Sequence, residues 1–302
     1  MRILTVLNRD GGTLKSTDLT RYRSHLQSVF ERAGHDFECR IVTGAQIVAA
    51  LEEAGADDAV EGIVAGGGDG TVSAAAGIAW KAGKPLGVLP AGTLNLFARS
   101  LGLPLDIHEA ATALAVGRVA ECDIASVNGR PFVHQFSVGV QSRVVKQRDA
   151  RDHGSRLEKV LAGVRAAIAV FWRPPSFPVR VSLDGGARSE ERLSTIVLSN
   201  NPFAEGHLPY ADRLDGAKLG VYRAGVLSAQ ANMKLAADLV IGAWNTNPDL
   251  RIESARSAEL EFPKLKRNAT AVIDGELVPL ERHCKIEIHP GELKVMAPGK
   301  QA

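Results

Sequence analysis

The sequence predicts two domains, an N-terminal α/β domain with a parallel sheet and a C-terminal domain that is mainly β. Three observations support this fold class. The chain has 302 residues, which is enough for two domains. Apolar strands alternate with helices up to about residue 120, a pattern typical of a parallel α/β layer. From about residue 125 onward short β segments follow one another, so we expect the domain boundary near residues 123–126.

The first domain begins with an apolar strand over residues 2–7, followed by a glycine-containing loop. Ser16 or Thr17 is the expected N-cap of the next helix, and Gly34 is expected to end it. Two later strands lead directly into glycine turns. The predicted strands are 2–7, 37–42, 59–65 and 86–89, and the predicted helices run from residue 16 or 17 to about 33, and over 45–54, 72–81 and 95–100.

The second domain is predicted from short segments that resemble antiparallel strands. Two helices interrupt these segments, over residues 156–171 and 229–241. No fixed-period repeat is visible in the sequence. The predicted strands are 124–127, 132–138, 179–183, 194–199, 218–222, 251–252, 260–262, 271–273, 285–289 and 293–296.

The composition is that of an ordinary globular protein, with 45% apolar and 23% charged residues. The chain has 36 Lys+Arg and 34 Asp+Glu, which gives a net charge of +2. Nucleic-acid binding favours a strong basic excess, so we expect no nucleic-acid partner.

Cysteine usage and hydropathy indicate where the chain functions. The three cysteines are far apart and form no CxxC pair, which favours a reducing cytoplasm over a disulfide framework or a zinc site. The start of the chain has no signal-peptide pattern. No apolar run reaches the roughly 18 residues that span a bilayer. The longest candidate, residues 160–172, is interrupted by Arg165, so any membrane contact is expected to be peripheral.

The most informative motif is Gly-Gly-Gly-Asp-Gly-Thr at residues 66–71, between a predicted strand and a predicted helix. Glycine lets backbone N–H groups approach a ligand closely, and a helix N-terminus favours an anion. Phosphate is therefore the expected ligand, with a simple tight turn as the alternative. The motif is neither a Walker loop nor a dinucleotide GxGxxG, because Thr71 stands at the position of the third glycine.

A second turn, at residues 90–95, joins the next predicted strand to the next helix. Ligands collect at the carboxyl ends of strands in open parallel sheets, so both turns are expected to face the same crevice. Thr93 and Asn95 offer a hydroxyl and an amide to a phosphate or ribose. The alternative is a capped helix start with Thr93 as the cap.

Two acidic segments in the second half are further candidates. Asp274-Gly275-Glu276 follows an apolar strand, and taken alone a DG pair favours a hairpin turn. Asp212 and Asp215 lie three residues apart in a loop, which suits a hard cation such as Mg²⁺ or, equally, a solvated turn.

Together these motifs resemble the bacterial members of the diacylglycerol kinase catalytic family, lipid kinases whose relatives include sphingosine and ceramide kinases. The resemblance covers most of the chain. It rests on GGDGT at 67–71 and PxGTxNxFAR at 90–99, followed in order by Asp123, LDGAKLGVY at 214–222 and DGE at 274–276.

The resemblance implies a fold and a cleft. Residues 1–124, completed by 291–302, would form an α/β domain similar to NAD kinases and phosphofructokinases. Residues 125–290 would form a β-sandwich that carries the lipid substrate, with ATP in the cleft between the two domains.

The resemblance also implies roles for individual residues. Glu276 would be the general base, with Asp274 beside it, and Asp69 would organise the phosphates and the catalytic Mg²⁺. Asp212, Asp215 and the carbonyl of Ala217 would hold a structural Mg²⁺. The implied ATP-binding residues are Asn8, Thr43, Gly67, Gly68, Asp69, Gly70, Thr71, Gly92, Thr93 and Asn95.

The implied activity is transfer of the γ-phosphate of ATP to the hydroxyl of diacylglycerol or a related lipid at a membrane surface. Ser73-Ala74 and Leu96 depart from the family pattern, since an Asn-Glu pair and an aspartate are common there. Two alternatives therefore stay open: a ceramide or sphingoid-base kinase, and a weakly catalytic nucleotide- or lipid-binding homologue. A homodimer is a further open alternative. A basic stretch over 143–159 is either a lipid-docking segment or a solvated loop.

Overall fold

The computed structural model describes residues 1–149 and 174–298, and the chain divides into two compact units. Unit 1 consists of Met1–Ile124, Asp212–Gly216 and the C-terminal residues from His289. Unit 2 consists of Ala125–Ala211 and Ala217–Ile288. Each unit is described separately.

Unit 1 contains a parallel sheet in the order β4-β3-β1-β2. The C-terminal part of β15 lies beside β4, where Val295 pairs in parallel with Leu86. Both β3 and β4 are buried along their whole length, as expected for strands covered on two faces. The strands are β1 (Arg2–Asn8), β2 (Asp36–Val42), β3 (Gly62–Gly67), β4 (Leu86–Pro90) and β15 (His283–Ala297).

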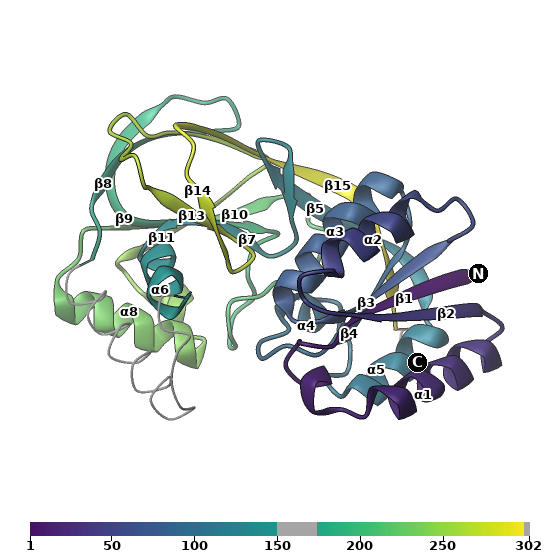
Figure 1. Cartoon of the computed structure of the whole chain (residues 1–302). Helices are drawn as coiled ribbons and strands as arrows, with labels where there is room; N and C mark the ends of the chain where they lie inside the picture. The colour runs from purple at the N-terminus through teal and green to yellow at the C-terminus, as the bar shows by residue number, and fades with distance from the viewer. Residues whose placement is uncertain (150–173, 299–302) are drawn as a thin grey trace. The chain divides into compact units, whose positions relative to one another are not determined.

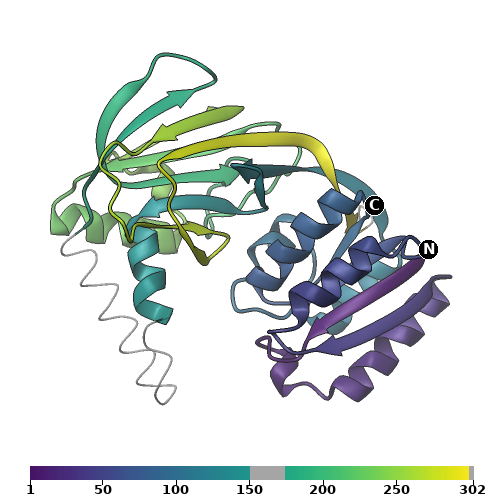
Figure 2. The same cartoon turned by 45° about the horizontal axis from the view of Figure 1, so that its top comes forward.

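Helices cover both faces of this sheet (Figures 1 and 2). Helices α1 and α5 pack together on one face, and α2 and α3 pack together on the other. Helix α3 ends in a left-handed glycine, Gly83 with φ +67°, a position where a side chain would be strained. The helices are α1 (Leu19–Arg32), α2 (Ile47–Ala56), α3 (Asp69–Ala82), α4 (Leu96–Ser100) and α5 (Ile107–Ala115), with a 3₁₀ turn η1 (Leu14–Ser16).

Unit 2 is built from antiparallel strands in the order β14-β13-β7-β9-β8-β12-β15, with β10 pairing to β9 and β11 to β10. Strand β5 crosses from unit 1 into unit 2 along the chain and pairs with β6. The strands are β5 (Arg118–Val127), β6 (Arg130–Phe132), β7 (Gln135–Gly139), β8 (Phe177–Leu183), β9 (Ser189–Asn200), β10 (Leu219–Gly225), β11 (Leu250–Ala255), β12 (Ser257–Glu261), β13 (Thr270–Ile273) and β14 (Glu276–Pro279).

The two faces of the β7–β9 pair have different surroundings. Phe136, Val138, Ile196 and Leu198 point into the hydrophobic core of unit 2. Because side chains alternate along a strand, the residues between them face the opposite side. Helices α6 (Val140–Asp149) and α8 (Ala229–Ile241) lie on that side, with the 3₁₀ turn η2 (Trp244–Thr246) after α8 (Figure 1).

The predicted fold class is confirmed: the N-terminal part has a parallel sheet between helices, and the C-terminal part has antiparallel strands. The ATP cleft between the domains stays a prediction. Within the described ranges, no helix is both long and apolar enough to cross a bilayer. The helix predicted over 156–171 lies outside the described residues, as does most of the basic stretch.

Several predicted boundaries were wrong for identifiable reasons. Asp18, and neither Ser16 nor Thr17, caps α1, because the two earlier residues belong to η1 and its following turn. Asn95 with φ +51°, and not Thr93, is the N-cap of α4. The strand predicted over 132–138 is interrupted, and the two predicted C-terminal strands are one strand, β15. Helices α5 and α6 were not predicted at all.

Candidate active site

The carboxyl ends of β1, β3 and β4 meet at one edge of the unit 1 sheet. The register pairs Leu7 with Gly66, and Gly67 with Pro90, so the loops after these strands are neighbours. Backbone hydrogen bonds join the loops: Ala91 N donates to Gly67 O over 2.9 Å, and Thr13 N donates to Ala91 O over 2.9 Å. The three loops therefore form one connected surface.

The two glycine turns predicted to bind phosphate touch at Gly68 and Gly92. A Cβ built on Gly92 would lie 2.8 Å from the Gly68 Cα, which is backbone and cannot move aside as a flexible side chain can. A Cβ on Gly67 would lie 2.6 Å from the Thr71 side chain. The two turns thus meet backbone against backbone, a junction that we call the cradle, and neither Gly67 nor Gly92 has room for a side chain.

Helix α3 begins at this cradle with available donors. Gly68 is its N-cap and, having no side chain, accepts no capping hydrogen bond from the first amides of the helix. The N–H groups of a first helical turn have no intrahelical acceptor, and the helix dipole adds positive potential there. The cradle and these amides fit a phosphate group.

Asp69 is the structural link between the two turns. Its carboxylate accepts hydrogen bonds from Asn95 N over 3.1 Å and from Leu96 N over 2.7 Å. The Asn95 side chain completes the arrangement, accepting from Gly92 N over 2.8 Å and donating to Gly92 O over 3.0 Å. Both Asp69 oxygens thus hold the start of α4, a role that the sequence did not predict.

Asn8 and Thr71 also meet at this edge. The Asn8 amide donates to the Thr71 hydroxyl over 3.2 Å, although the two residues are 63 positions apart in sequence. Asp10, which sequence reasoning missed, accepts from Gly44 N over 2.8 Å and so ties the β1 loop to the loop after β2.

The other residues predicted to bind the nucleotide are Thr43, Gly70 and Thr93. The Thr43 hydroxyl donates to the Gln46 side chain over 2.9 Å. Thr93 is exposed on the second turn, and Gly70 is half-buried in the first turn of α3.

In unit 2, the carboxylate of Asp274 holds the backbone of the segment before β7. It is 6% exposed and accepts hydrogen bonds from three consecutive backbone amides, Val133, His134 and Gln135, over 2.8–2.9 Å. Asp274 N in turn donates to Gln135 O over 2.9 Å. These bonds take the place of ladder pairing, which explains why the predicted strand over 132–138 is interrupted.

Glu276 lies at the start of β14, just beyond a two-residue hairpin turn. Asp274 and Gly275 have φ of +47° and +88°, the left-handed pair that a DG hairpin turn requires. The Glu276 side chain is 60% exposed and lies 3.9 Å from the Arg130 guanidinium. The carboxylate is therefore accessible to a substrate and has a cation nearby.

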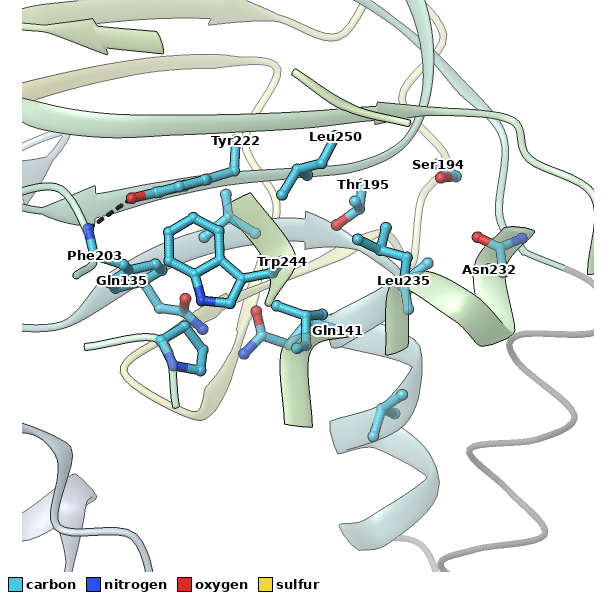
Figure 3. A pocket seen from close by; sticks show the side chains of 15 residues that line it. Gln135, Gln141, Ser194, Thr195, Phe203, Tyr222, Asn232, Leu235, Trp244 and Leu250 are labelled. Carbon is cyan, nitrogen blue, oxygen red and sulfur yellow. Dashed lines mark hydrogen bonds between the residues drawn. The ribbon is translucent and has the colours of Figure 1, made fainter. Parts of the chain in front are cut away.

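A largely apolar pocket of about 270 Å³ opens on the helix-covered face of the unit 2 sheet (Figure 3). Strands β7, β9, β10 and β11 form its floor, and α6, α8 and η2 contribute walls. Helix α6 also packs against β13 and β14, the two strands of the Glu276 hairpin. Its lining residues are Gln135, Val140, Gln141, Val144, Ser194, Thr195, Val197, Phe203, Pro209, Tyr222, Asn232, Leu235, Leu239, Trp244 and Leu250.

Stacked aromatic rings fix one wall of this pocket. Phe203 stacks on Tyr222 with ring centroids 5.0 Å apart, and Trp244 meets Tyr222 edge-on at 5.5 Å. Phe203 N donates to the Tyr222 hydroxyl oxygen over 2.6 Å. Burial raises the pKa of Tyr222 to about 12, so its hydroxyl stays protonated at neutral pH.

The predicted cation loop has exposed carboxylates. Asp212 and Asp215 are exposed in segment Asp212–Gly216 of unit 1, and Asp215 accepts from Arg213 Nε over 3.1 Å. Ala217, with φ +52°, starts the next segment of unit 2. Across residues 1–149 and 174–298, no cluster of three or more His, Cys, Asp or Glu side chains could hold a metal. The site predicted from Asp212, Asp215 and the Ala217 carbonyl has two carboxylates and one backbone carbonyl, so it is not such a cluster and stays a prediction.

The structure thus brings the predicted residues into two separate groups. Asn8, Gly67, Gly68, Asp69, Gly70, Thr71, Gly92, Thr93 and Asn95 gather at one sheet edge of unit 1, whereas Asp274 and Glu276 belong to the hairpin of unit 2. The pocket residues were missed. They come from four strands, three helical segments and the loop after β9, which are distant in sequence, so no local pattern marks them.

Comparison with known proteins gives a consistent picture. Residues 2–127 match the model of the diacylglycerol kinase catalytic domain. A diacylglycerol kinase of Staphylococcus aureus is 28% identical over 74% of this chain and 73% of its own. A probable lipid kinase YegS-like of Klebsiella pneumoniae is 37% identical over 35% of each chain. The chain spans between 35% and 59% of the length of three of the curated relatives it matches.

The fold has counterparts among solved structures. A diacylglycerol kinase from Bacillus anthracis str. Sterne matches with a TM-score of 0.71 and 20% sequence identity, covering 100% of this chain and 98% of that chain. At this identity the likeness shows the shared fold alone. The motifs at the β3 and β4 ends lie within residues 2–127, the part of the chain that matches the model of the diacylglycerol kinase catalytic domain.

Proposed function

We propose that the chain is a lipid kinase that transfers the γ-phosphate of ATP to the hydroxyl of diacylglycerol or a related lipid. The observation that carries the proposal is the contact between Gly68 and Gly92, which leaves a backbone cradle at the start of α3. Such a cradle suits the phosphates of a nucleotide. The family match of residues 2–127 supports the same activity.

ATP would supply the phosphoryl group, with a bond forming from the acceptor oxygen to the γ-phosphorus while the bond to the β-phosphate oxygen breaks. The first amides of α3 would bind the phosphates, and Asp69 would keep the Gly92 turn in place through Asn95 and Leu96. Phosphoryl transfer depends mostly on such positioning and on charge neutralisation. Asp69 would also help to hold the catalytic Mg²⁺, whose charge would offset that of the phosphates.

Unit 2 would supply the acceptor side. The apolar pocket suits a hydrocarbon chain, and α6 connects it to the hairpin that carries Glu276. The Glu276 carboxylate would take the proton of the acceptor hydroxyl. Asp274 would act as a positioning residue, since its oxygens hold three amides that fix the hairpin against β7.

Ceramide or a sphingoid base is the alternative acceptor. These lipids also join an apolar chain to a hydroxyl. The pocket of about 270 Å³ is too small to hold a whole lipid, so its volume does not distinguish these lipids from diacylglycerol. A binding homologue with little catalysis is the alternative from another class, motivated by Leu96 and Ala74.

The decisive experiment is a panel of assays with radiolabelled ATP and Mg²⁺. Diacylglycerol, ceramide, sphingosine and phosphatidylglycerol would each be presented in mixed micelles. We expect labelled product from diacylglycerol or from one of the related lipids. If every lipid stays unlabelled while the protein still binds ATP, the kinase proposal is wrong and the binding homologue replaces it.

The Glu276→Gln variant tests the general base. We expect it to lower the turnover number by about 10²–10⁴-fold, the usual contribution of a general base, while ATP affinity is unchanged. Glu281→Gln is the matched control, because Glu281 is an exposed glutamate just beyond β14. Undiminished turnover in Glu276→Gln would exclude Glu276 as the base.

A further inference from the structure

Trp244 carries a hydrogen-bond donor without an acceptor. Its side chain is only 2% exposed, and within the described residues Nε1 has no hydrogen-bond partner. A buried N–H group almost always has one, because leaving it unpaired costs its full desolvation free energy. An acceptor supplied by a bound molecule would remove this cost at the indole nitrogen.

This donor belongs to the wall of the apolar pocket. Trp244 lines the pocket together with the amide side chains of Gln135 and Gln141 (Figure 3). In that view the nitrogen lies on the edge of the indole drawn toward these two amides. The edge-on contacts of Trp244 with Tyr222 and Phe203 hold the ring, so the N–H direction is fixed.

The rest of the pocket limits what the acceptor can be. Val140, Val144, Leu235, Leu239 and Leu250 offer apolar surface, which suits a hydrocarbon chain. Three polar lining residues already donate to backbone carbonyls: Ser194, Thr195 and Asn232. The volume of about 270 Å³ is slightly below the roughly 300 Å³ at which pockets for whole small molecules begin. One chain with its first polar group fits this space better than a complete two-chain lipid.

We propose that Trp244 Nε1 donates a hydrogen bond to the carbonyl oxygen of an acyl chain that occupies the pocket. The inference rests on the proposed function and adds to it one residue that would distinguish lipids with an acyl carbonyl from lipids without one. Gln135 lies beside this group on β7, and its backbone is fixed by Asp274. The hydrogen bonds between Gln135 and Asp274 thereby connect the proposed carbonyl site to the hairpin that carries Glu276.

The proposal predicts discrimination between two lipids of the same length. Dioctanoylglycerol carries ester carbonyls, whereas its dioctyl ether analogue carries none, and both keep the same free hydroxyl. Binding of each in the same detergent micelles would be measured by calorimetric titration without ATP. We expect the wild-type protein to bind the ester about tenfold more tightly, the usual worth of one hydrogen bond made by a buried donor.

Trp244→Phe removes the donor and keeps an aromatic ring. We expect the ester-to-ether preference to fall to about one, through weaker binding of the ester and unchanged binding of the ether. Trp80→Phe is the matched control, because Trp80 Nε1 already has a partner in unit 1, the Glu292 carboxylate at 2.9 Å. That variant is expected to keep the tenfold preference.

The outcomes separate this inference from the kinase proposal. An ester preference that Trp244→Phe removes supports the inference even if no lipid is phosphorylated, which would reject only the kinase proposal. Equal binding of ester and ether by the wild-type protein overturns the inference, whether or not Trp244→Phe folds. The inference is also wrong if neither lipid binds, or if Trp244→Phe keeps the full preference.

Discussion

Gly92 occupies a position where a single methyl group has no room. Gly92→Ala would place a carbon 2.8 Å from the Gly68 Cα and 2.9 Å from Asn95 Oδ1, so one glycine turn must shift. Overpacking of this kind costs about 1–3 kcal/mol, and here it falls on the proposed phosphate cradle. We expect at least about tenfold weaker binding of an ATP analogue, measured by titration.

Gly225→Ala is the control for this substitution. Nothing lies within 4 Å of a Cβ built at Gly225. Its affinity and melting temperature are expected to match those of the wild-type protein. Unchanged nucleotide affinity in Gly92→Ala would mean that the two turns do not bind phosphate as proposed.

Two acidic residues illustrate how sequence patterns mark a position without giving its role. Asp69 and Asp274 were both predicted as catalytic groups, and the structure shows each accepting backbone amides from a segment distant in sequence. A carboxylate that accepts two or three N–H bonds stabilises a loop whether or not it contacts a substrate. Their catalytic roles stay predictions, whereas their positioning roles are visible.

At the scale of single elements, the start of α1 depends on Asp18. Its carboxylate accepts from Thr20 N and Arg21 N, each over 3.1 Å. Asp18→Ala would leave both amides without a side-chain acceptor, and we expect the free energy of unfolding to fall by about 1 kcal/mol. Urea denaturation followed by circular dichroism measures this change.

Ser16→Ala distinguishes the observed cap from the one expected from sequence. The Ser16 hydroxyl only donates back to Thr13 O in the preceding 3₁₀ turn. We expect a change within about 0.5 kcal/mol, as for an ordinary surface substitution. A larger loss in Ser16→Ala than in Asp18→Ala would contradict the assignment of the cap.

The elements that were predicted best have a strong local signal. Strands β1, β3 and β4 are largely apolar runs that end at Asn8, Gly67 and Pro90, and α8 was predicted with its observed bounds. Helix α5 was missed although Asp106 caps it, through hydrogen bonds from His108 N and Glu109 N. Interrupted strands were predicted poorly, because the break at residues 133–134 is caused by Asp274, some 140 positions later.

At the scale of the whole molecule, three buried thiols make the free energy of unfolding depend on pH in the alkaline range. Burial raises the pKa of Cys39 from 9.0 to about 11, and the pKa values of Cys122 and Cys284 to about 12. Above about pH 9 the unfolded chain loses these protons while the folded protein keeps them. The contribution of the buried, protonated thiols to the free energy of unfolding is therefore fully present below about pH 9. It is lost as the pH rises toward about 11–12.

Urea denaturation at several pH values between about 8 and about 11 measures this dependence. We expect the free energy of unfolding to fall over that range, and to fall less steeply in a variant with all three cysteines replaced by alanine. Identical pH profiles for the two proteins would show that the thiols do not cause the effect.

The sequence by itself determined the alternation of strands and helices from β1 to α4, the two-part fold class and the glycine turns at the ends of β3 and β4. These features are local: hydrophobic periodicity and turn residues act over a few positions of the chain. Only the tertiary structure decided that Asn8 meets Thr71, that Asp69 and Asp274 hold distant amides, and that Trp244 lines a pocket with a donor unpaired among the described residues. Such contacts join residues far apart in sequence, and they exist only after packing has brought those segments together.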